Sequence, residues 1–375
     1  MRSIETLSEA ELRGKRVLVR AGLDVPVGDA GEVTDLFRVR RAIPTLQFLV
    51  AAGARVVIIS HIGRDPGESN APVAEALRRH IPVSFVPDLL GVVARQAVAG
   101  LRDGEVLMLE NLRQDERETA NDAAFAQELA TLGDIYVNDA FSAAHRAHAS
   151  IVGIPAHLPS YAGLLLSEEV AQLNRARAPE GPSFAILGGA KFETKSHLIR
   201  SLLEHYDQVF ITGALANDVF KARGFPVGVS LVSAELPGPD VLEHPRFLSP
   251  TDVTVELPNG QARVKLPQEV ANDENIVDIG PDSVAQLAPH IAAATFILWN
   301  GPTGLHEHGY VHWTHAIAEL IAKSDAQKVI GGGDTIATLQ DSGIDSDKLG
   351  FLSTGGGAML EYLLEGTLPG IQALT

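Results

Sequence analysis

The sequence predicts an α/β protein with parallel β-sheets in two domains, and three observations support this prediction. Short runs of β-branched residues alternate with longer amphipathic stretches along almost the whole chain, which is the pattern of repeated βαβ units. The 375 residues correspond to two domains at roughly 150 residues each. The chain divides near residues 155–178, where prolines precede an apolar and acidic stretch that is typical of a connecting helix.

Ten strands are expected from the β-branched and apolar runs. They cover residues 16–20, 56–60, 83–86, 106–109 and 135–138 in the first half, and residues 184–187, 208–211, 295–299, 328–330 and 351–353 in the second. Helical patterns between them include residues 40–52, 123–132 and 316–323. The connecting helix is expected to begin with Ser160 as its N-cap. Residues 230–275 are rich in proline and are expected to form extended strands and turns.

Composition excludes several classes of function. The formal charge of −17 argues against a nucleic-acid partner, because such a partner requires a basic face. No apolar stretch approaches the roughly 20 residues that span a membrane. The first 13 residues carry three glutamates and lack the apolar core of a signal peptide, and the absence of cysteine excludes disulfides and thiolate chemistry. We therefore expect a cytoplasmic protein that does not bind membranes.

Cationic side chains follow successive strands of the first half, where ligands bind in open α/β sheets. They are Arg38, His61, Arg64, Arg113, His145, Arg146 and His148. Arginine forks recognise phosphate or carboxylate groups through paired hydrogen bonds. A single arginine of this kind could instead form a surface ion pair, but the recurrence after several strands favours an anion site.

Glycine-rich loops follow the strands of the second half. They are Gly188–Lys191, Gly213, Asn300–Pro302, Gly331–Thr335 and Thr354–Gly357. Such loops let backbone N–H groups and helix N-termini approach an anion, although a single glycine cluster is more often only a turn. Lys191 and Lys195 share a helix face if this segment is helical, and Asp334 is a candidate Mg²⁺ ligand, which together favour a nucleotide site. The P-loop and Gly-x-Gly-x-x-Gly signatures are absent.

Taken together, these motifs resemble the phosphoglycerate kinase family nearly from end to end. The most specific segments are Ala144–Ser150, Gly188–Lys191 and Ser353–Ala358. The resemblance implies two doubly wound, Rossmann-like parallel-sheet domains joined by a hinge helix. The implied boundaries are a phosphoglycerate-binding domain at 1–155, the connecting helix at 156–178 and a nucleotide-binding domain at 179–357, with a tail at 358–375 that returns to the first domain.

The resemblance also implies reversible phosphoryl transfer from 1,3-bisphosphoglycerate to Mg–ADP, carried out by a monomer on small-molecule substrates. The implied phosphoglycerate site comprises Gly22, Leu23, Asp24, Arg38, His61, Ile62, Gly63, Arg64, Arg113 and Arg146. The implied nucleotide site comprises Gly189, Ala190, Lys195, Gly213, Asn300, Glu307, Gly332, Gly333, Asp334 and Thr335, with Asp334 as the Mg²⁺ ligand. The implied catalytic groups are Arg38, Lys191, Lys195 and the amides of Gly333 and Gly356.

The sequence departs from the family at several positions. The family's Asp-Phe-Asn after the first strand aligns with Gly22–Leu23–Asp24, so Asp24 either repels the substrate anion or takes over its hydroxyl group, and we favour the second hypothesis. Thr194 replaces an aspartate, and residues 212–216 lack two glycines, which leaves the choice between ATP and GTP open. A regulatory binding protein and a kinase for another carboxylate remain alternatives. Four histidines between His306 and His315 raise a metal site as a further alternative to a solvated loop.

Overall fold

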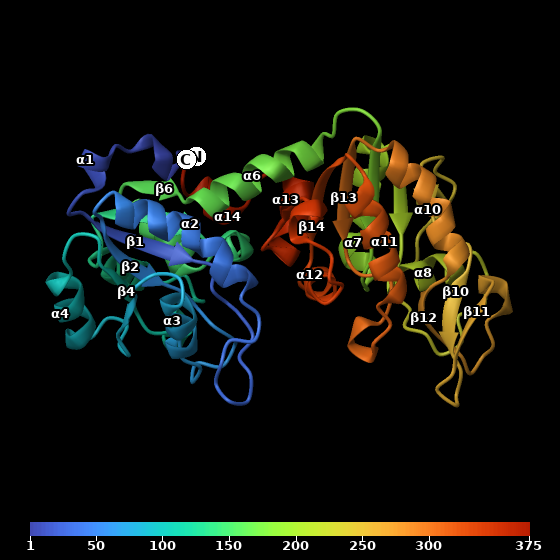
Figure 1. Cartoon of the computed structure of the whole chain (residues 1–375), viewed down its shortest axis with the longest axis horizontal. Helices are drawn as coiled ribbons and strands as arrows, with labels where there is room; N and C mark the ends of the chain where they lie inside the picture. The colour runs from blue at the N-terminus through green and yellow to red at the C-terminus, as the bar shows by residue number, and fades with distance from the viewer. The chain divides into compact units, whose positions relative to one another are not determined.

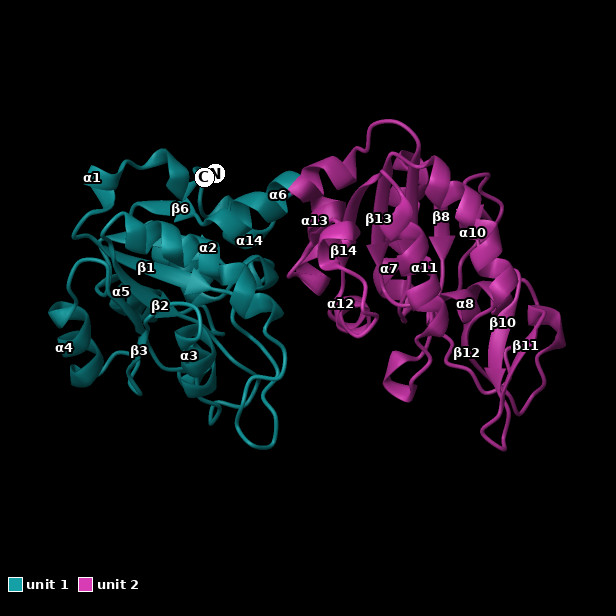
Figure 2. Cartoon of the chain, viewed as in Figure 1, with its two compact units in different colours: residues 1–171, 367–375 teal, residues 172–366 magenta.

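The computed structural model describes all 375 residues, which form two compact units (Figure 2). Unit 1 comprises residues 1–171 and 367–375, and unit 2 comprises residues 172–366. Each unit contains a six-stranded sheet of parallel strands, so the predicted α/β class is confirmed. No helix in either unit has the length and apolar character needed to cross a bilayer.

The sheet of unit 1 has the strand order β3-β4-β2-β1-β5-β6. Its strands are β1 (Arg16–Ala21), β2 (Arg55–Ile59), β3 (Ser84–Phe85), β4 (Val106–Met108), β5 (Ile135–Asp139) and β6 (Ser160–Ala162). The β-branched residues of β1 and β2 are buried, which is why these runs form the centre of the sheet. The chain proceeds outward from β1 in both directions, so the carboxyl end of β1 lies at a switch point where such sheets bind ligands.

Helices flank the sheet of unit 1 (Figure 1). They are α1 (Glu9–Leu12), α2 (Phe37–Ala51), α3 (Ala71–Arg78), α4 (Val92–Gly100), α5 (Ala123–Ala130) and the C-terminal α14 (Pro369–Gln372). Short 3-10 or π turns lie at Ile4–Thr6, Leu112–Gln114, Phe141–Ala143, Ala149–Gly153 and Ile154–Ala156. Helix α2 buries Val39, Leu46 and Leu49 in the same core as Val19 of β1. This packing fixes the start of α2 beside the carboxyl end of β1, because a helix buries its apolar stripe against the sheet.

The segment before the connecting helix differs from the prediction. Ser160 does not cap a helix, because residues 160–162 form β6, which pairs with β5 and bridges Ser3. The Ser160 hydroxyl donates to the carbonyl of Leu158 instead. The helix α6 (Leu164–Arg177) starts after Gly163, and the boundary between the units falls within it.

The return to unit 1 also differs from the prediction. The sequence predicts a tail from residue 358, whereas the structure returns only residues 367–375. Helix α13 (Gly356–Glu365) belongs to unit 2, where Tyr362 is buried and donates to Asn174. The final residues are tied to unit 1 by a backbone hydrogen bond from Gly370 to Ala144. Both chain ends consequently lie near each other in this unit (Figure 1).

The main sheet of unit 2 has the order β15-β14-β13-β7-β8-β9. Its strands are β7 (Ser183–Leu187), β8 (Gln208–Ile211), β9 (Phe247–Leu248), β13 (Phe296–Asn300), β14 (Gln327–Gly331) and β15 (Phe351–Leu352). A second, antiparallel sheet consists of β10 (Val253–Glu256), β11 (Ala262–Lys265) and β12 (Asn275–Ile279). The extended structure predicted for the proline-rich stretch is thus present, and β10 and β12 border the pocket described below.

The helices of unit 2 alternate with the strands of its main sheet. They are α7 (Phe192–His205), α8 (Ala214–Ala222), α9 (Pro239–Leu242), α10 (Pro281–Ala293), α11 (His312–Lys323), α12 (Gly333–Gln340) and α13, with 3-10 turns at Pro267–Glu269, His306–His308 and Ser346–Leu349. Trp299 of β13 is fully buried and packs with Ile317 and Ile321 of α11. The loops after β7, β8, β13, β14 and β15 lie at one edge of this sheet, because parallel strands end on the same side.

Candidate functional site

An arginine-lined cavity lies at the carboxyl edge of the unit 1 sheet. It has a volume of about 720 Å³ and is lined by Arg64, Pro66, Arg113, Gln114, Glu116, Thr119, Arg146 and His148. Three of the predicted cations, Arg64, Arg113 and Arg146, therefore meet at one cavity although they come from three different loops. The loops converge because each follows a parallel strand of one sheet.

The charge of this cavity comes from arginine rather than histidine. Burial and the charge of Arg146 lower the pKa of Arg113, so the guanidinium groups repel one another across the cavity. Burial lowers the pKa of His145, and burial followed by Arg20 lowers that of His148 to about 4, so both imidazoles are neutral at pH 7. Mutually repelling arginines beside neutral histidines form a site that an anion would stabilise.

Asp24 is a carboxylate held next to these cations. Its Oδ1 accepts a hydrogen bond of 2.9 Å from the amide of Gly63, and its Oδ2 lies 3.5 Å from Nε2 of His61. Arg38 donates to the backbone carbonyl of Asp24. Burial opposes ionisation of Asp24, but the His61 N–H, the Gly63 amide and the charge of Arg38 prevail and lower its pKa to about 2. Asp24 is therefore a fixed anion at neutral pH.

The buried Arg20, which was not among the predicted site residues, contacts His61 from the side opposite Asp24. Its guanidinium donates to Nδ1 of His61 at 2.7 Å and to Oγ of Ser150 at 2.9 Å. Ser150 in turn donates to the buried carboxylate of Glu118 at 2.5 Å. Because arginine can only donate, Nδ1 of His61 is an acceptor and the proton of the neutral ring lies on Nε2, toward Asp24. A charged residue within a buried strand was the signal that could have identified Arg20.

Several predicted site residues face away from the cavity. The side chains of Leu23 and Ile62 belong to the hydrophobic core, and their amides bind Ser60 and Asn111, respectively. Gly22 is also buried, and a Cβ atom there would lie 3.3 Å from the Cα of Ala140. These three residues therefore shape the loops that carry Asp24 and His61 rather than present side chains to a ligand.

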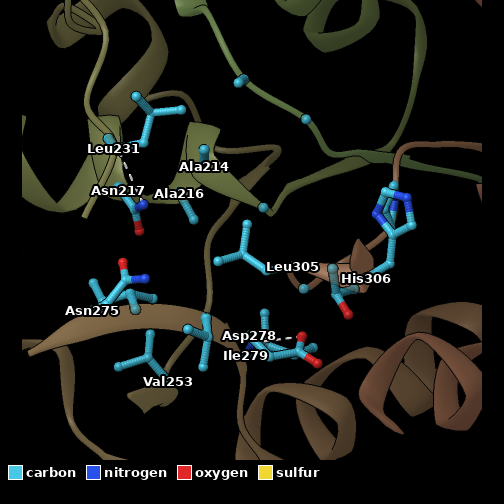
Figure 3. A pocket seen from close by; sticks show the side chains of 18 of the residues that line it. Ala214, Ala216, Asn217, Leu231, Val253, Asn275, Asp278, Ile279, Leu305 and His306 are labelled. Atoms are coloured by element: carbon cyan, nitrogen blue, oxygen red, sulfur yellow. Dashed lines mark hydrogen bonds between the residues drawn. The ribbon is translucent and has the colours of Figure 1, made fainter. Parts of the chain in front are cut away.

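A second pocket of about 550 Å³ lies in unit 2 at the carboxyl edge of its main sheet (Figure 3). The predicted residues on its lining are Gly189, Ala190, Gly213, Glu307 and Asp334. Aliphatic side chains from α8 and the small sheet complete it, among them Ala216, Val253 and Ile276. One end of the pocket is therefore glycine-rich and polar, and the other is apolar, which is the composition of a ligand site with an anionic and an apolar part.

Lys195 is held over the loop that follows β7. Its ammonium group donates to the carbonyl of Gly188 at 2.8 Å. Burial lowers its pKa, while the charge of Asp334 acts in the opposite direction. Gly189 has φ of +105°, and a Cβ atom there would lie 2.3 Å from Nζ of Lys195, so the glycine provides the space for the lysine. Lys191 precedes α7 in a left-handed conformation (φ 65°), which costs energy for a residue other than glycine.

Two helix N-termini lie side by side near this loop. Helix α12 begins at Gly333 and α13 at Gly356, and a Cβ atom on Gly356 would lie 3.7 Å from the amide nitrogen of Gly333. Their free amides and helix dipoles favour an anion at the same point. The buried Thr335 accepts a hydrogen bond from the amide of Gly301, which ties the loop after β13 to α12. Asn300 is buried beside Met359, and Gly332 (φ +100°) forms the turn into α12.

The histidine-rich segment does not gather into a metal site. Nδ1 of His306 lies 3.3 Å from Glu307 and its Nε2 lies 3.8 Å from Asp334. His315 instead contacts the carbonyl of Thr338, and His312 packs on Trp313. No three histidine, aspartate or glutamate side chains of the structure form a metal-ligand group.

Each unit is thus an α/β domain with a cavity at the carboxyl edge of its parallel sheet, one lined by arginines and the other by glycine-rich loops and aliphatic side chains. Comparison with known proteins identifies one family along nearly the whole chain. The family model for phosphoglycerate kinase matches residues 7–367. The chain therefore belongs to the phosphoglycerate kinase family.

Individual relatives agree with this assignment along the full chain. The phosphoglycerate kinase of Moorella thermoacetica is 41% identical, covering 99% of this chain and 98% of the relative. That of Rubrobacter xylanophilus is 42% identical, covering 98% and 97%. Among solved structures, phosphoglycerate kinase from Coxiella burnetii has a TM-score of 0.83 at 37% identity, with 99% of this chain and 98% of that one covered. The enzyme from Pyrococcus horikoshii has a TM-score of 0.88 at 29% identity, covering 100% and 98%.

Proposed function

We propose that this chain catalyses the reversible transfer of a phosphoryl group between 1,3-bisphosphoglycerate and Mg–ADP, giving 3-phosphoglycerate and ATP, the glycolytic reaction of its family. The observation that carries the proposal is the convergence of Arg64, Arg113 and Arg146 on one cavity of unit 1. A phosphorylated carboxylic acid supplies the charges that this cluster needs. The enzyme is then a phosphotransferase with a carboxyl group as acceptor.

In unit 1, the three cavity arginines hold the phosphate of the phosphoglycerate and Asp24 accepts a hydrogen bond from its hydroxyl group. Neutral His61 directs its protonated Nε2 toward Asp24, whose Oδ2 lies 3.5 Å away. Arg38 lies where it can stabilise charge on the transferring group, because its guanidinium is anchored on the Asp24 carbonyl. The reacting groups, a carboxylate and a phosphate oxygen of ADP, are already ionised. The transfer therefore needs positioning and charge stabilisation rather than a general base.

In unit 2, the nucleotide occupies the pocket with its phosphates at the glycine-rich end. Lys191, Lys195 and the amides of Gly333 and Gly356 neutralise charge on the transferring phosphoryl group. Asp334 is a single carboxylate near this end, which fits Mg²⁺ that arrives on the nucleotide phosphates, because Mg²⁺ binds few protein carboxylates alongside phosphate oxygens and waters. Glu307 lies at the pocket where it can bind the ribose.

We further propose that the enzyme works as a cytoplasmic monomer, with 1–155 and 179–357 as its binding domains and α6 as a hinge. The residues that line each of the two cavities all belong to a single chain, which is compatible with a monomer. Transfer requires the reacting atoms to come within about 3–3.5 Å, so the two bound substrates must be brought together during the reaction. A helix shared by both units is a suitable element for this movement.

A coupled assay with 3-phosphoglycerate and Mg–ATP tests the proposal. The unmodified chain and the variant Lys221→Ala, which changes an exposed lysine of unit 2, are expected to turn over. Lys195→Ala is expected to lose at least about 100-fold in kcat, because it removes a cation from the transferring group. Absence of turnover in the unmodified chain, or full activity of Lys195→Ala, would overturn the proposal.

A further inference from the structure

Lys191 has a backbone conformation that lysine rarely adopts. Only two residues of the chain other than glycine have a positive φ, and these are Asn121 and Lys191. Asparagine tolerates the left-handed region because its short polar side chain can bond to the nearby backbone, whereas lysine has no such compensation. The angles of Lys191 are φ 65° and ψ 79°. Such a conformation persists only where the surrounding structure holds it, and residues held in this way cluster at functional sites.

The peptide group between Lys191 and Phe192 is held at both of its polar atoms. Its carbonyl oxygen accepts from the amide of Thr194 at 3.1 Å and from Oγ1 of Thr194 at 2.8 Å. Its N–H, on Phe192, donates to Oγ of Ser233 at 2.9 Å. The Thr194 bonds arise within the first turn of α7, but Ser233 lies 41 residues away from Phe192 in the sequence. Ser233 therefore ties the backbone at Lys191 to a distant segment of unit 2.

Asp218 of α8 determines how the Ser233 hydroxyl group is used. Oγ of Ser233 donates to Oδ2 of Asp218 at 2.8 Å, and the Ser233 amide donates to Oδ1 at 2.7 Å. A hydroxyl group has one hydrogen to donate and two lone pairs that accept. Because the hydrogen is directed to Asp218, which is only 1% exposed, a lone pair of Oγ remains for the N–H of Phe192.

Helix α7 depends on this arrangement because it has no capping side chain of its own. The first amides of a helix need acceptors from outside the helix, and a serine at the N-cap position is a common source. Here the N-cap position is occupied by Lys191, whose side chain makes no capping hydrogen bond. Ser233 supplies the acceptor from another segment instead. Lys191 is thereby left exposed at the start of the helix, where its ammonium group can meet an anion.

We propose that Ser233, oriented by Asp218, is a positioning residue that holds Lys191 in its left-handed conformation for phosphoryl transfer. The proposal rests on the proposed function, because it assumes that Lys191 neutralises charge on the transferring group. The backbone conformation of a residue decides where its side chain points, so a return of Lys191 to negative φ would redirect the ammonium group. Neither Ser233 nor Asp218 lines one of the two cavities, so both act through the backbone at Lys191.

The variant Ser233→Ala removes the acceptor of the Phe192 N–H. In the coupled assay with 3-phosphoglycerate and Mg–ATP, we expect kcat to fall about 5- to 50-fold, because an amide loses its partner and the productive conformation of Lys191 becomes less populated. KM for Mg–ATP should stay within about twofold, because an interaction made in the transition state affects kcat.

Two further variants control for the substitution. Ser233→Thr keeps the hydroxyl group and should restore kcat to within about threefold of the unmodified chain. Ser324→Ala removes a hydroxyl group that donates to the carbonyl of Ile321 at the end of α11, and it should leave kcat unchanged. An unchanged kcat in Ser233→Ala, or the same loss in Ser233→Thr, would overturn the proposal.

A double-variant cycle shows whether Ser233 acts through Lys191. The variant Lys191→Ala has no ammonium group to orient. Adding Ser233→Ala to it should therefore lower kcat by less than about twofold, although the same change costs about 5- to 50-fold in the unmodified chain. Equal losses in the two backgrounds would mean that Ser233 supports the pocket without acting on Lys191, and would overturn the proposal.

A crystal structure of Ser233→Ala measures the conformation directly and does not depend on turnover. We expect a negative φ at Lys191 in this variant and a positive φ in the unmodified chain. A positive φ in Ser233→Ala would refute this inference even where 3-phosphoglycerate is turned over. The expected change of φ, together with an unmodified chain that does not turn over 3-phosphoglycerate, would refute only the proposed reaction.

Discussion

Replacing Asp24 tests whether this carboxylate binds the substrate hydroxyl or repels the substrate anion. Its side chain is 34% exposed, and its pKa of about 2 makes it fully ionised at neutral pH. The variant Asp24→Ala removes both the charge and the acceptor. Asp24→Asn removes only the charge and keeps a neutral acceptor.

Two opposing effects set the size of the response. A unit charge about 5 Å from a bound anion contributes about 1–3 kcal/mol of repulsion at effective dielectric constants of roughly 20 to 80. A hydrogen bond from the substrate hydroxyl to a carboxylate contributes about 1.5–3 kcal/mol in the other direction. Because the two nearly cancel, the affinity for 3-phosphoglycerate alone would change little when Asp24 is replaced. The coupling between the residue and the hydroxyl group, however, retains the full contribution of the hydrogen bond.

Calorimetry with two ligands isolates that coupling. The ligands are 3-phosphoglycerate and the analogue that lacks its 2-hydroxyl group. In the unmodified chain, we expect the analogue to bind about 10- to 100-fold more weakly, and in Asp24→Ala less than about fivefold more weakly. Asp24→Asn should fall between them. Asp29→Asn, which removes a charge from an exposed position, serves as the control and should behave as the unmodified chain.

The opposite result would refute the reasoning. If removal of the hydroxyl cost the same in the unmodified chain and in Asp24→Ala, Asp24 would not contact that hydroxyl. If both ligands then bound more tightly to Asp24→Ala by the same factor, Asp24 would act as a repulsive charge, which is the alternative that the sequence leaves open.

Three further predictions concern other parts of the molecule. Lys195→Met should reduce kcat by about 100- to 1000-fold while leaving the melting temperature within a few degrees, measured by the coupled assay and by calorimetry. Burial raises the pKa of Asp278 from 3.8 to about 7, so its stabilising effect is complete below about pH 4 and is lost as the pH rises through 7. At about 1.4 kcal/mol per pH unit, the free energy of unfolding should fall over this range by at most about 4 kcal/mol, and Asp278→Asn should remove that dependence in urea titrations. Arg20→Met should lower the free energy of unfolding by about 3–5 kcal/mol, because it leaves Glu118 buried without its countercharge, and adding Glu118→Gln should restore part of the loss. A double variant no more stable than Arg20→Met would exclude that coupling.

The regular elements were predictable because local sequence determines them. The runs at β1 and β8 match the structure within one residue, since buried parallel strands need continuous apolar or β-branched residues. Strand β6 was not predictable in this way. Its three residues contain no β-branched side chain, and it exists because β5 and Ser3 lie beside it. Pairing with distant segments, rather than propensity, decides the structure of so short a piece.

The site was predictable to the extent that its residues follow strands. Arg64, Arg113 and Arg146 could be placed at one edge because the topology of parallel sheets brings such loops together. The interactions of Arg20 could not be predicted, because Ser150 and His61 are 130 and 41 residues away from it in the sequence. No local pattern identifies which distant groups will satisfy a buried charge.

The two departures at residues 22 and 24 are best understood as one change. A side chain at position 22 would meet Oγ of Ser142 at 3.1 Å and the backbone of Ala140 at 3.3 Å, so this position offers little room for a carboxylate. Asp24 accepts a hydrogen bond from the Gly63 amide, and its Oδ2 lies 3.5 Å from Nε2 of His61, the ring nitrogen that carries the proton because Arg20 donates to the other one. The buried network therefore supports an acceptor at residue 24 rather than at residue 22. A carboxylate can therefore remain beside the arginines although its position in the sequence shifts by two residues. The edge of the sheet, rather than one sequence position, determines where a ligand contacts this loop.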